Sequence, residues 1–441
     1  MAVTPLDSPL FGGLLSDREL AAIFSDARLV AEMVAAERAL ARCEGRLGVI
    51  PAAHAAAIDA ALAQVSLDPA TLAAGTAADG APVPALVAAL RAAVGGEAAG
   101  FVHWGATSQD ILDTATVLQL AAALPVLEAR LEAAIRALAA LADRHRATVM
   151  IGRTGGQQAA PTTFGLRAAS WLAPLVRHRR RLHELRPRVL VASLGGAVGN
   201  LGALGGRGPE VAAAFAAELG LAEPAMPWHA QRDGLAEAGA WAGFVTGSLG
   251  RIAQDVILLA QNEVGELRLR GAGGSSTMPN KANPVAAEAV LALARAAPAL
   301  VGQLGQALVH AQERDGAAWT QEWLALPQLV VGAGAALART LALLEALEVD
   351  AARMAANLDA TRGLVLAEAA VFALAAHMPR ADARAAVDAA CAAVAAGDGS
   401  LVAVLRTRAA APVDWERLAD PLAAAGPADA LIDRVLAAAA A

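Results

Sequence analysis

The longest helical pattern in the chain covers residues 111–146 and reads ILDTATVLQLAAALPVLEARLEAAIRALAALADRHR. Apolar side chains recur along it at the spacing of one helix face, and only Pro125 interrupts it. At 1.5 Å per residue this pattern predicts roughly 50 Å of helix, which is long for a globular domain. A helix of that length indicates a bundle of long helices as the framework of the fold.

Helical patterns dominate the rest of the chain as well. Further long patterns cover residues 161–186, 232–269, 284–314 and 320–347. No strand alternation of any length and no fixed-period repeat is visible, so the sequence predicts an all-α fold. We expect three parts: a small helical N-terminal domain at 1–106, a central long-helix bundle at 107–350, and a small helical C-terminal domain at 351–441.

Composition excludes several classes of protein. The formal net charge of −7 argues against a general nucleic-acid binder. Hydrophobic residues make up 57% of the chain, but alanine supplies much of that fraction, and alanine is the best helix former. The longest uncharged run, residues 189–206, carries six glycines and is a poor membrane span. We therefore predict no nucleic-acid partner and no membrane partner.

The N-terminus and the cysteines predict a cytoplasmic protein without a metal site. The first residues, MAVTPLDSPLFGG, show neither a basic region nor an apolar one typical of an export signal. Cys43 and Cys391 form no CxxC pattern, which suits a reducing compartment. No HExxH motif occurs, and the eight histidines are scattered. The sequence thus predicts no metal site and no cofactor.

One predicted loop is unusually rich in polar side chains. GSSTMPNKANP, at residues 274–284, lies between two long helical patterns, and its glycine, serines and two prolines predict a loop. Loops on rigid scaffolds often carry binding and catalytic groups. Lys281 in this loop is the only lysine in the chain. Two serines, two asparagines and the single lysine so close together favour a functional loop over a plain connector.

This loop matches the GSSxMPxKxNP signature of the fumarase/aspartase superfamily, which the chain therefore resembles. HWGATSQDILDT, at residues 103–114, is similar to the H-x-G-x-T-S-x-D segment of the adenylosuccinate lyase branch, and GRTGGQQAAPTT, at 152–163, to its GRTHxQPAxPTT segment. PWHAQRDGL, at 227–235, and the segment 349–369 resemble the bacterial cycloisomerases that act on 3-carboxy-cis,cis-muconate. The resemblance covers essentially the whole chain and implies the same three-part, all-α fold.

The resemblance also implies a reaction and its site residues. The reaction is conversion of 3-carboxy-cis,cis-muconate to 4-carboxymuconolactone, in the protocatechuate branch of the β-ketoadipate pathway. A carboxylate adds within the molecule to an alkene carbon, and a proton is transferred at the α carbon. Ser275 matches the proton-transfer serine of the superfamily, and Lys281 would stabilise the negative charge that develops. The implied substrate-binding residues are Thr107, Ser108, Thr154, Gln157, Gln231, Ser276 and Asn283.

The implied partners are few. The substrate is a small polycarboxylate. The hydroxyls of Thr107 and Ser108 stand just before the longest helical pattern, where free backbone N–H groups can hold an anion. The superfamily resemblance further implies a homotetramer whose active sites are shared between subunits, with the central bundle at 107–350 carrying the active site and the oligomer contacts.

Two residues depart from the lyase branch. Gly155 stands where the lyases have a catalytic histidine, and Trp323, in the pair Glu322-Trp323, stands where they have a second substrate-binding arginine. Both departures favour the cycloisomerase, although cycloisomerases usually carry a bulky residue at the position of Gly155. The alternatives are another superfamily lyase of the adenylosuccinate lyase type and a catalytically silent structural relative. A nucleic-acid binder acting through the arginine-rich residues 177–188 is a further alternative. The favoured interpretation of these residues is a solvated or intersubunit face.

Three more side chains are candidates with two interpretations each. His103 and His229 could be structural imidazoles, or either could act as the second acid/base group or bind a substrate carboxylate. Arg314 could clamp a carboxylate, or it could form an internal ion pair in its Glu-Arg-Asp setting. The sequence leaves these alternatives open.

Overall fold

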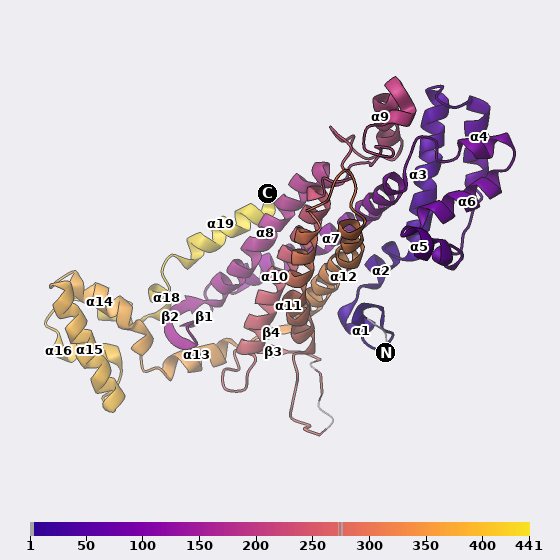
Figure 1. Cartoon of the computed structure of the whole chain (residues 1–441). Helices are drawn as coiled ribbons and strands as arrows, with labels where there is room; N and C mark the ends of the chain where they lie inside the picture. Colours follow the sequence, from indigo (N-terminus) through magenta and orange to yellow (C-terminus); the bar gives the residue numbers. More distant parts are fainter. Residues whose placement is uncertain (1–3, 272, 275–276) are drawn as a thin grey trace. The chain divides into compact units, whose positions relative to one another are not determined.

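The computed structural model of the chain describes residues 4–271, 273–274 and 277–441. It is 69% helical, which confirms the predicted all-α fold class. Long helices supply the framework (Figure 1). They are α7 (Ser108–Arg144), α8 (Phe164–Val189), α10 (Asp233–Leu259), α11 (Val285–Gln306) and α12 (Gly316–Ala346).

Helix α7 begins three residues before the expected Ile111 because the sequence supplies a cap there. The carboxylate of Asp110, in the third helical position, accepts a hydrogen bond from the backbone N–H of Thr107 at 2.9 Å. Pro125 lies inside the helix without ending it. Its neighbours Leu124 and Leu127 are buried, at 1% and 0% exposure. Burial of this face outweighs the cost of the missing hydrogen-bond donor.

The described chain forms two compact units, each built from segments that are separated in sequence. Unit 1 comprises the chain up to Arg130 together with residues 178–247 and 292–338. Unit 2 comprises residues 131–177, 248–291 and 339–441. The expected division into three domains at residues 106 and 350 stays a prediction.

The N-terminal helices of unit 1 pack closely around α3 (Asp26–Arg46). A Cβ at Gly45 would lie 2.3 Å from the Cβ of Ala55 in α4 (Ala52–Leu62), so only glycine permits this helix contact. Arg42 of α3 bonds at 2.8 Å both to Asp59 of α4 and to Glu218 of α9 (Gly208–Glu218). The remaining short helices of this unit are η1 (Pro5–Asp7), α1 (Gly12–Leu15), α2 (Arg18–Ile23), η2 (Pro69–Leu72), α5 (Ala73–Asp79), α6 (Val83–Val94), η3 (Glu97–Phe101) and η4 (Gly202–Arg207).

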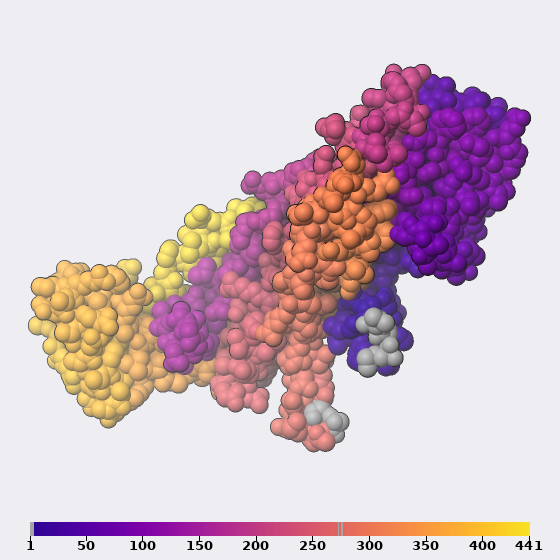
Figure 2. Space-filling view, viewed as in Figure 1, coloured from indigo at the N-terminus to yellow at the C-terminus, as the bar shows by residue number. Residues whose placement is uncertain are grey.

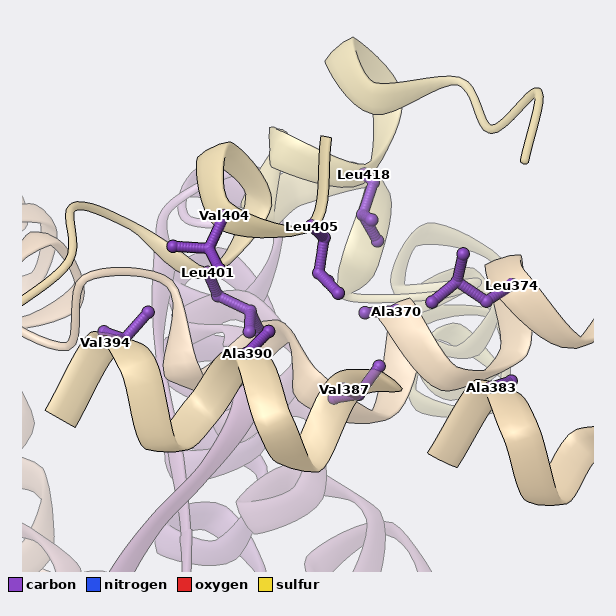
Figure 3. Packing of buried hydrophobic residues seen from close by; sticks show 10 residues of the cluster. All are labelled: Ala370, Leu374, Ala383, Val387, Ala390, Val394, Leu401, Val404, Leu405 and Leu418. Atoms are coloured by element: carbon purple, nitrogen blue, oxygen red, sulfur yellow. The ribbon is translucent and has the colours of Figure 1, made fainter. Parts of the chain in front are cut away.

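The C-terminal part of unit 2 has a small apolar core of its own. Leu374, Val387, Leu401 and Leu405 meet there, each at most 1% exposed (Figure 3). Fully burying such a side chain contributes about 1.5–3 kcal/mol relative to exposing it. The helices of this part are α13 (Ala351–Asp359), η5 (Leu364–Leu366), α14 (Ala367–Ala375), α15 (Arg380–Ala396), α16 (Leu401–Arg408), α17 (Trp415–Ala419), α18 (Pro421–Ala424) and α19 (Ala428–Ala440).

Short strands occur where the sequence predicted none. Strands β1 (Val149–Thr154) and β2 (Gln157–Thr163) form an antiparallel hairpin in unit 2. Gly155 and Gly156 connect them with φ of 56° and 77°, and a two-residue hairpin turn with both φ positive selects glycine. A second ribbon pairs β3 (Leu267–Leu269) with β4 (Leu347–Val349). These strands are too short, and their alternation too weak, to stand out from helical surroundings.

Three helices in the described part of the chain, α7, α11 and α12, are long and apolar enough to cross a membrane by length and composition. Helices α7 and α12 nevertheless carry Asp113 and Glu322, whose carboxylates are buried in ion pairs with Arg232. The predicted absence of a membrane partner stays a prediction.

The arginine-rich residues 177–188 lie on α8, and several of their side chains are paired. Arg180 bonds to Glu184 at 2.7 Å, and Arg186 bonds to Glu128 at 2.6 Å. Arg188 bonds to Glu237 in α10. Because carboxylates already neutralise these guanidinium groups, the run is better explained as a solvated, ion-paired face than as a polyanion site.

Candidate active site

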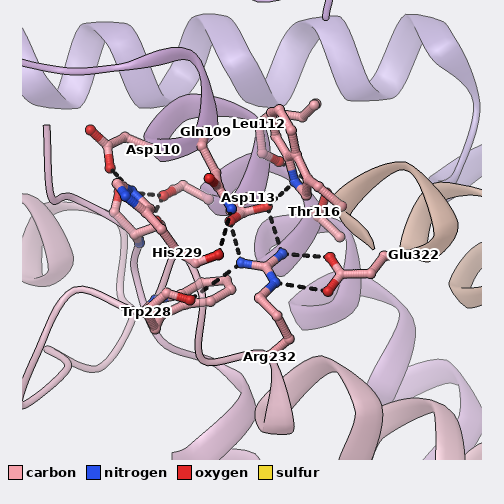
Figure 4. A network of polar contacts seen from close by, with 12 residues as sticks. Gln109, Asp110, Leu112, Asp113, Thr116, Trp228, His229, Arg232 and Glu322 are labelled. Atoms are coloured by element: carbon pink, nitrogen blue, oxygen red, sulfur yellow. Dashed lines mark hydrogen bonds and ion pairs between the residues drawn. The ribbon is translucent and has the colours of Figure 1, made fainter. Parts of the chain in front are cut away.

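A buried carboxylate organises the start of α7 in unit 1. Asp110 is 0% exposed and its oxygens accept hydrogen bonds from four donors. Three are backbone N–H groups, of Thr107 at 2.9 Å, Gly195 at 2.7 Å and Gly196 at 2.9 Å. The fourth is His229 Nε2, at 2.6 Å from Asp110 Oδ1 (Figure 4). The start of α7, the glycine-rich loop after α8 and the segment before α10 are therefore fixed to one another.

The predicted anion binders Thr107 and Ser108 lie at this helix end. Both are half-buried, and neither hydroxyl has a hydrogen-bond partner among the residues that the structure describes. The first turn of α7 also presents backbone N–H groups, which favour an anion at a helix N-terminus. Two hydroxyls and these amides can together hold a carboxylate.

An arginine with two carboxylates lies beside this group. Arg232 is 2% exposed and bonds to Asp113 at 2.6 and 3.0 Å and to Glu322 at 2.8 and 2.5 Å. Trp319 Nε1 donates to Asp113 Oδ1 at 2.8 Å, and the guanidinium lies over the ring of Trp228 (Figure 4). Burial would lower the pKa of Arg232, but the two carboxylates, Asp113 first, raise it. Arg232 therefore stays charged.

The same ion pair contains one carboxyl group whose pKa is raised. Burial raises the pKa of Glu322, and it outweighs the opposing effect of Arg232. Two carboxylates compete for one guanidinium, so Asp113 adds to the rise. These ion pairs link α7, α12 and the segment before α10, and they fix the residue next to Gln231.

Gln231 and Arg314 approach this region from two loops. Gln231 is exposed between the buried His229 and Arg232, so its amide faces solvent. Arg314 Nη2 donates to the carbonyl of Ala197 at 2.8 Å, in the glycine-rich loop. Within the described chain Arg314 has no ion pair. Asp315 accepts hydrogen bonds from the backbone N–H groups of Ala311, Ala317 and Ala318. The internal ion-pair interpretation of Arg314 is therefore not supported.

His103 lies in a different setting. Its Nδ1 is 2.6 Å from Glu37 Oε1, and its backbone has a positive φ of 64°. Glu37 is 2% exposed, and Glu44, one of its neighbours on α3, is 0% exposed. Burial first, and then Glu37, raise the pKa of Glu44 to about 9. These contacts fit the structural interpretation of His103, as the partner of a buried carboxylate.

Unit 2 brings two other predicted residues together. Thr154 and Gln157 face each other across the hairpin turn, and both are exposed. Below them Arg153 bonds to the buried Glu266 at 2.9 and 2.6 Å, and Asn357 donates to the same carboxylate at 2.9 Å. The hairpin is thus fixed at its base and presents two polar side chains at its tip.

The signature loop is also part of unit 2. The predicted Ser275 and Ser276 lie outside the described residues. Asn283 and Gly273 exchange backbone hydrogen bonds at 2.7 and 3.0 Å. The Lys281 side chain is exposed, and it has no partner in the part of the loop that the structure describes. In Figure 2 the described residues 277–284 lie on a protrusion of the surface.

The structure groups the predicted residues by unit. Unit 1 brings together the start of α7, His229 and the loops of Gln231 and Arg314, whereas Thr154 and Gln157 form one pair in unit 2 and Lys281 and Asn283 another. Sequence reasoning missed Asp110, Asp113 and Arg232. Two acids three residues apart in the first two turns of a long helix were the available signal. No group of three or more possible metal ligands occurs among the described residues.

Comparison with known proteins extends over nearly the whole chain. A family model described as lyase matches residues 16–299. The 3-carboxy-cis,cis-muconate cycloisomerase of Bradyrhizobium diazoefficiens is 44% identical over 440 residues, covering 97% of this chain and 98% of that protein. The nitrosuccinate lyase of Streptomyces davaonensis is 40% identical over 450 residues, covering 98% and 95%. The structure of the 3-carboxy-cis,cis-muconate lactonizing enzyme from Pseudomonas putida aligns with a TM-score of 0.91 at 39% identity, covering 98% of this chain and 99% of that one.

Proposed function

This chain belongs to the lyase family of the fumarase/aspartase superfamily, and we propose that it converts 3-carboxy-cis,cis-muconate to 4-carboxymuconolactone. The observation that carries the proposal is the 44% identity, over 97% of the chain, to a cycloisomerase acting on that substrate. The polar loop at 274–284 and the start of α7 offer the polar and anion-binding groups that such a substrate requires.

The reaction needs one proton donor and fixed positive charge. A carboxylate oxygen bonds to the alkene carbon that bears the 3-carboxyl group. The alkene electrons move into the neighbouring carboxylate, which becomes a dianionic enolate, and a proton is then delivered to the α carbon. In our proposal Ser275 delivers that proton. Lys281 and Asn283 stabilise the dianion.

The start of α7 binds a second carboxylate of the substrate. Thr107 and Ser108 present hydroxyls without partners in the described chain, beside a helix N-terminus that favours anions. Thr154 and Gln157 contribute a third polar group from the hairpin tip. A substrate with three carboxylates would then meet three separate polar groups.

We propose a homotetramer in the cytoplasm, with active sites shared between subunits. The Lys281 side chain is exposed, and it has no partner among the described residues. Only 22% of the most apolar stretch of α11 is buried within the chain. Phe244 and Leu258 of α10 are 56% and 46% exposed. Apolar helix faces of this kind are stabilised by burial against another subunit.

A second candidate is elimination from a succinyl substrate, because a nitrosuccinate lyase is 40% identical over 98% of the chain. Gly155 and Trp323 argue against a lyase of the adenylosuccinate type. Trp323 packs edge-on against Trp319 at 4.8 Å, where a substrate-binding arginine was expected for such a lyase. A catalytically silent relative would not need Lys281, Thr107 and Ser108 together.

One spectroscopic experiment separates these functions. Purified protein is mixed with 3-carboxy-cis,cis-muconate, and the diene absorbance is followed, with a Ser275→Ala variant prepared in parallel. Catalysed loss of absorbance by the wild type and not by the variant supports the cycloisomerase. Unchanged absorbance, together with release of fumarate from adenylosuccinate or turnover of nitrosuccinate, would support a lyase instead.

A further inference from the structure

The tip of the β1–β2 hairpin in unit 2 carries two polar side chains that are open to a ligand. Thr154 and Gln157 are exposed, and neither side chain has a hydrogen-bond partner among the residues that the structure describes. A Cβ at Gly155 or Gly156 would meet no described atom beyond its chain neighbours within 4 Å, so the space around the turn is open. A hydroxyl and an amide can both donate hydrogen bonds to a carboxylate.

The strand register decides which way these two side chains point. Successive side chains of a strand point to opposite faces, and residues directly opposite on paired strands share a face. Thr154 and Gln157 are directly opposite one another, so they share one face, and the neighbouring Arg153 points to the other. Ile151, two residues before Arg153, shares the face of Arg153 and is 0% exposed, packed with Leu358 of α13. One face of the strand is thus anchored within unit 2, and the opposite face carries the polar tip.

Glu266 is the anchor of Arg153. Its side chain is 0% exposed, and its two oxygens accept from Nη1 of the guanidinium at 2.9 Å and from Nη2 at 2.6 Å, which is the bidentate geometry. Asn357 of α13 donates to the same carboxylate at 2.9 Å. The backbone of Glu266 is held as well, because its N–H donates to the carbonyl of Leu259 and its carbonyl accepts from the N–H of Asp350. The carboxylate is therefore a fixed point to which the hairpin is attached.

A bulge next to Arg153 gives this attachment its importance. Gly152 pairs with Ala160, whereas Arg153 pairs with Gln158, so Ala159 is an extra residue in the second strand. A bulge interrupts the ladder of hydrogen bonds and bends the strand. A Cβ at Gly152 would lie 2.9 Å from the carbonyl oxygen of Ala160, so only glycine fits at this bend. Two short strands with an interrupted ladder hold the tip weakly, and the ion pair supplies the constraint that the ladder lacks.

We infer that Glu266 is a positioning residue of the proposed reaction, an inference that rests on the proposed function. Through Arg153 it fixes the face on which Thr154 and Gln157 stand, so that both side chains donate to one carboxylate of the substrate. Glu266 is buried, and it acts only through the residue that it holds. Its charge therefore affects substrate binding rather than the chemical step, and KM rather than kcat reports its loss.

The test is steady-state kinetics of Glu266→Gln with 3-carboxy-cis,cis-muconate. Glutamine keeps the size of the side chain but removes the charge and one of the two oxygens that Arg153 binds. We expect KM to rise about 10- to 100-fold while kcat stays within about twofold of the wild type. Asp255→Asn is the matched control, because Asp255 of α10 accepts hydrogen bonds from Arg167 and Trp171 of α8 in the same unit and lies outside the hairpin. This control should leave KM unchanged even if it lowers the melting temperature.

A second comparison asks whether the effect passes through the tip of the hairpin. Thr154→Val and Gln157→Leu together remove both donors, and this double variant should itself raise KM. In that background Glu266→Gln should raise KM by less than about twofold more, because residues that act through one another are not additive. Arg153→Lys is the milder variant to use if Glu266→Gln does not fold. It keeps the charge, loses the planar fork and should raise KM in the same direction.

Two results would overturn the inference. An unchanged KM with a lower kcat in Glu266→Gln would show structural support only, since partial unfolding removes active enzyme without changing the affinity of the remainder. A full further rise in KM in the Thr154→Val and Gln157→Leu background would show that the charge acts by another route. Failure of the wild type to consume the substrate would instead refute the proposed function, so the two failures are distinguishable.

Discussion

Replacing Glu44 with glutamine should stabilise the protein at neutral pH. Glu44 is 0% exposed, and neither of its carboxyl oxygens has a hydrogen-bond partner among the described residues. Burial first, and then Glu37, raise its pKa from an ordinary value of 4.5 to about 9. A carboxyl group whose pKa is raised by folding contributes most stability below its unfolded pKa. That contribution is lost as the pH rises toward the folded value.

The size of the effect follows from this interval. From pH 4.5 to pH 7 the unfolded chain ionises while folded Glu44 stays protonated, at about 1.4 kcal/mol per pH unit. Relative to pH 4.5, Glu44 therefore lowers the free energy of unfolding of the wild type by about 3 kcal/mol at pH 7 and about 6 kcal/mol at pH 9. Glutamine has a similar size and polarity but does not titrate. Glu44→Gln should match the wild type near pH 4.5 and exceed it increasingly above.

The assay is denaturant unfolding of the wild type and Glu44→Gln from pH 5 to pH 9. Glu97→Gln is the control, because Glu97 is exposed and its removal should change stability by less than about 0.5 kcal/mol. We expect the gap between Glu44→Gln and wild type to widen with pH. A gap that stays constant from pH 5 to pH 8 would refute the argument, since it would mean that Glu44 is already ionised in the folded protein.

Four further predictions concern the site and its support. Ser275→Ala should lower kcat by about 10²–10⁴-fold with little change in substrate binding. Mixing this variant with an inactive Thr107→Val variant should restore partial activity if the site is shared between subunits, and an active monomer in sedimentation would contradict the shared site. Lys281→Arg should lose about 10²-fold or more in kcat/KM while the fold is kept, because a planar guanidinium replaces a compact ammonium; a fully active variant in steady-state kinetics would make the single lysine incidental. Arg232→Met should lower the free energy of unfolding by about 3–5 kcal/mol, since it leaves two buried carboxylates without their cation, and Glu322→Gln should lower it by less. Equal losses of stability for the two variants in thermal melts would contradict the role of Arg232 as the shared partner of both carboxylates. Incubation with EDTA should leave turnover unchanged, and recovery of lost activity by added zinc or magnesium would disprove this.

The sequence alone was sufficient for the fold class. The helical periodicity of residues 111–146 predicted α7, because the face that is buried repeats with the period of the helix itself. The motifs at 103–114, 152–163 and 274–284 were sufficient for the superfamily, and the relatives agree with that assignment. The roles of Ser275 and Ser276 remain predictions.

The hairpin around Gly155 could not be read from the sequence. Strands this short give little alternation, and the hairpin is held at its base by the Arg153–Glu266 contact, over more than a hundred residues of sequence. The structure also supplies a reason for Gly155 that the motif comparison lacked. Its φ of 56° is one that a turn of this type demands.

The buried polar groups were decided only by tertiary structure. His103 and His229 look alike in sequence, yet one ring pairs with Glu37 on α3 and the other with Asp110 at the start of α7. Arg232 was one arginine among many until folding placed two carboxylates around it. Local sequence determines helices because their hydrogen bonds close within four residues, whereas the partner of a buried charge can come from anywhere in the chain. Which atoms are left without partners is therefore a property of the folded molecule alone.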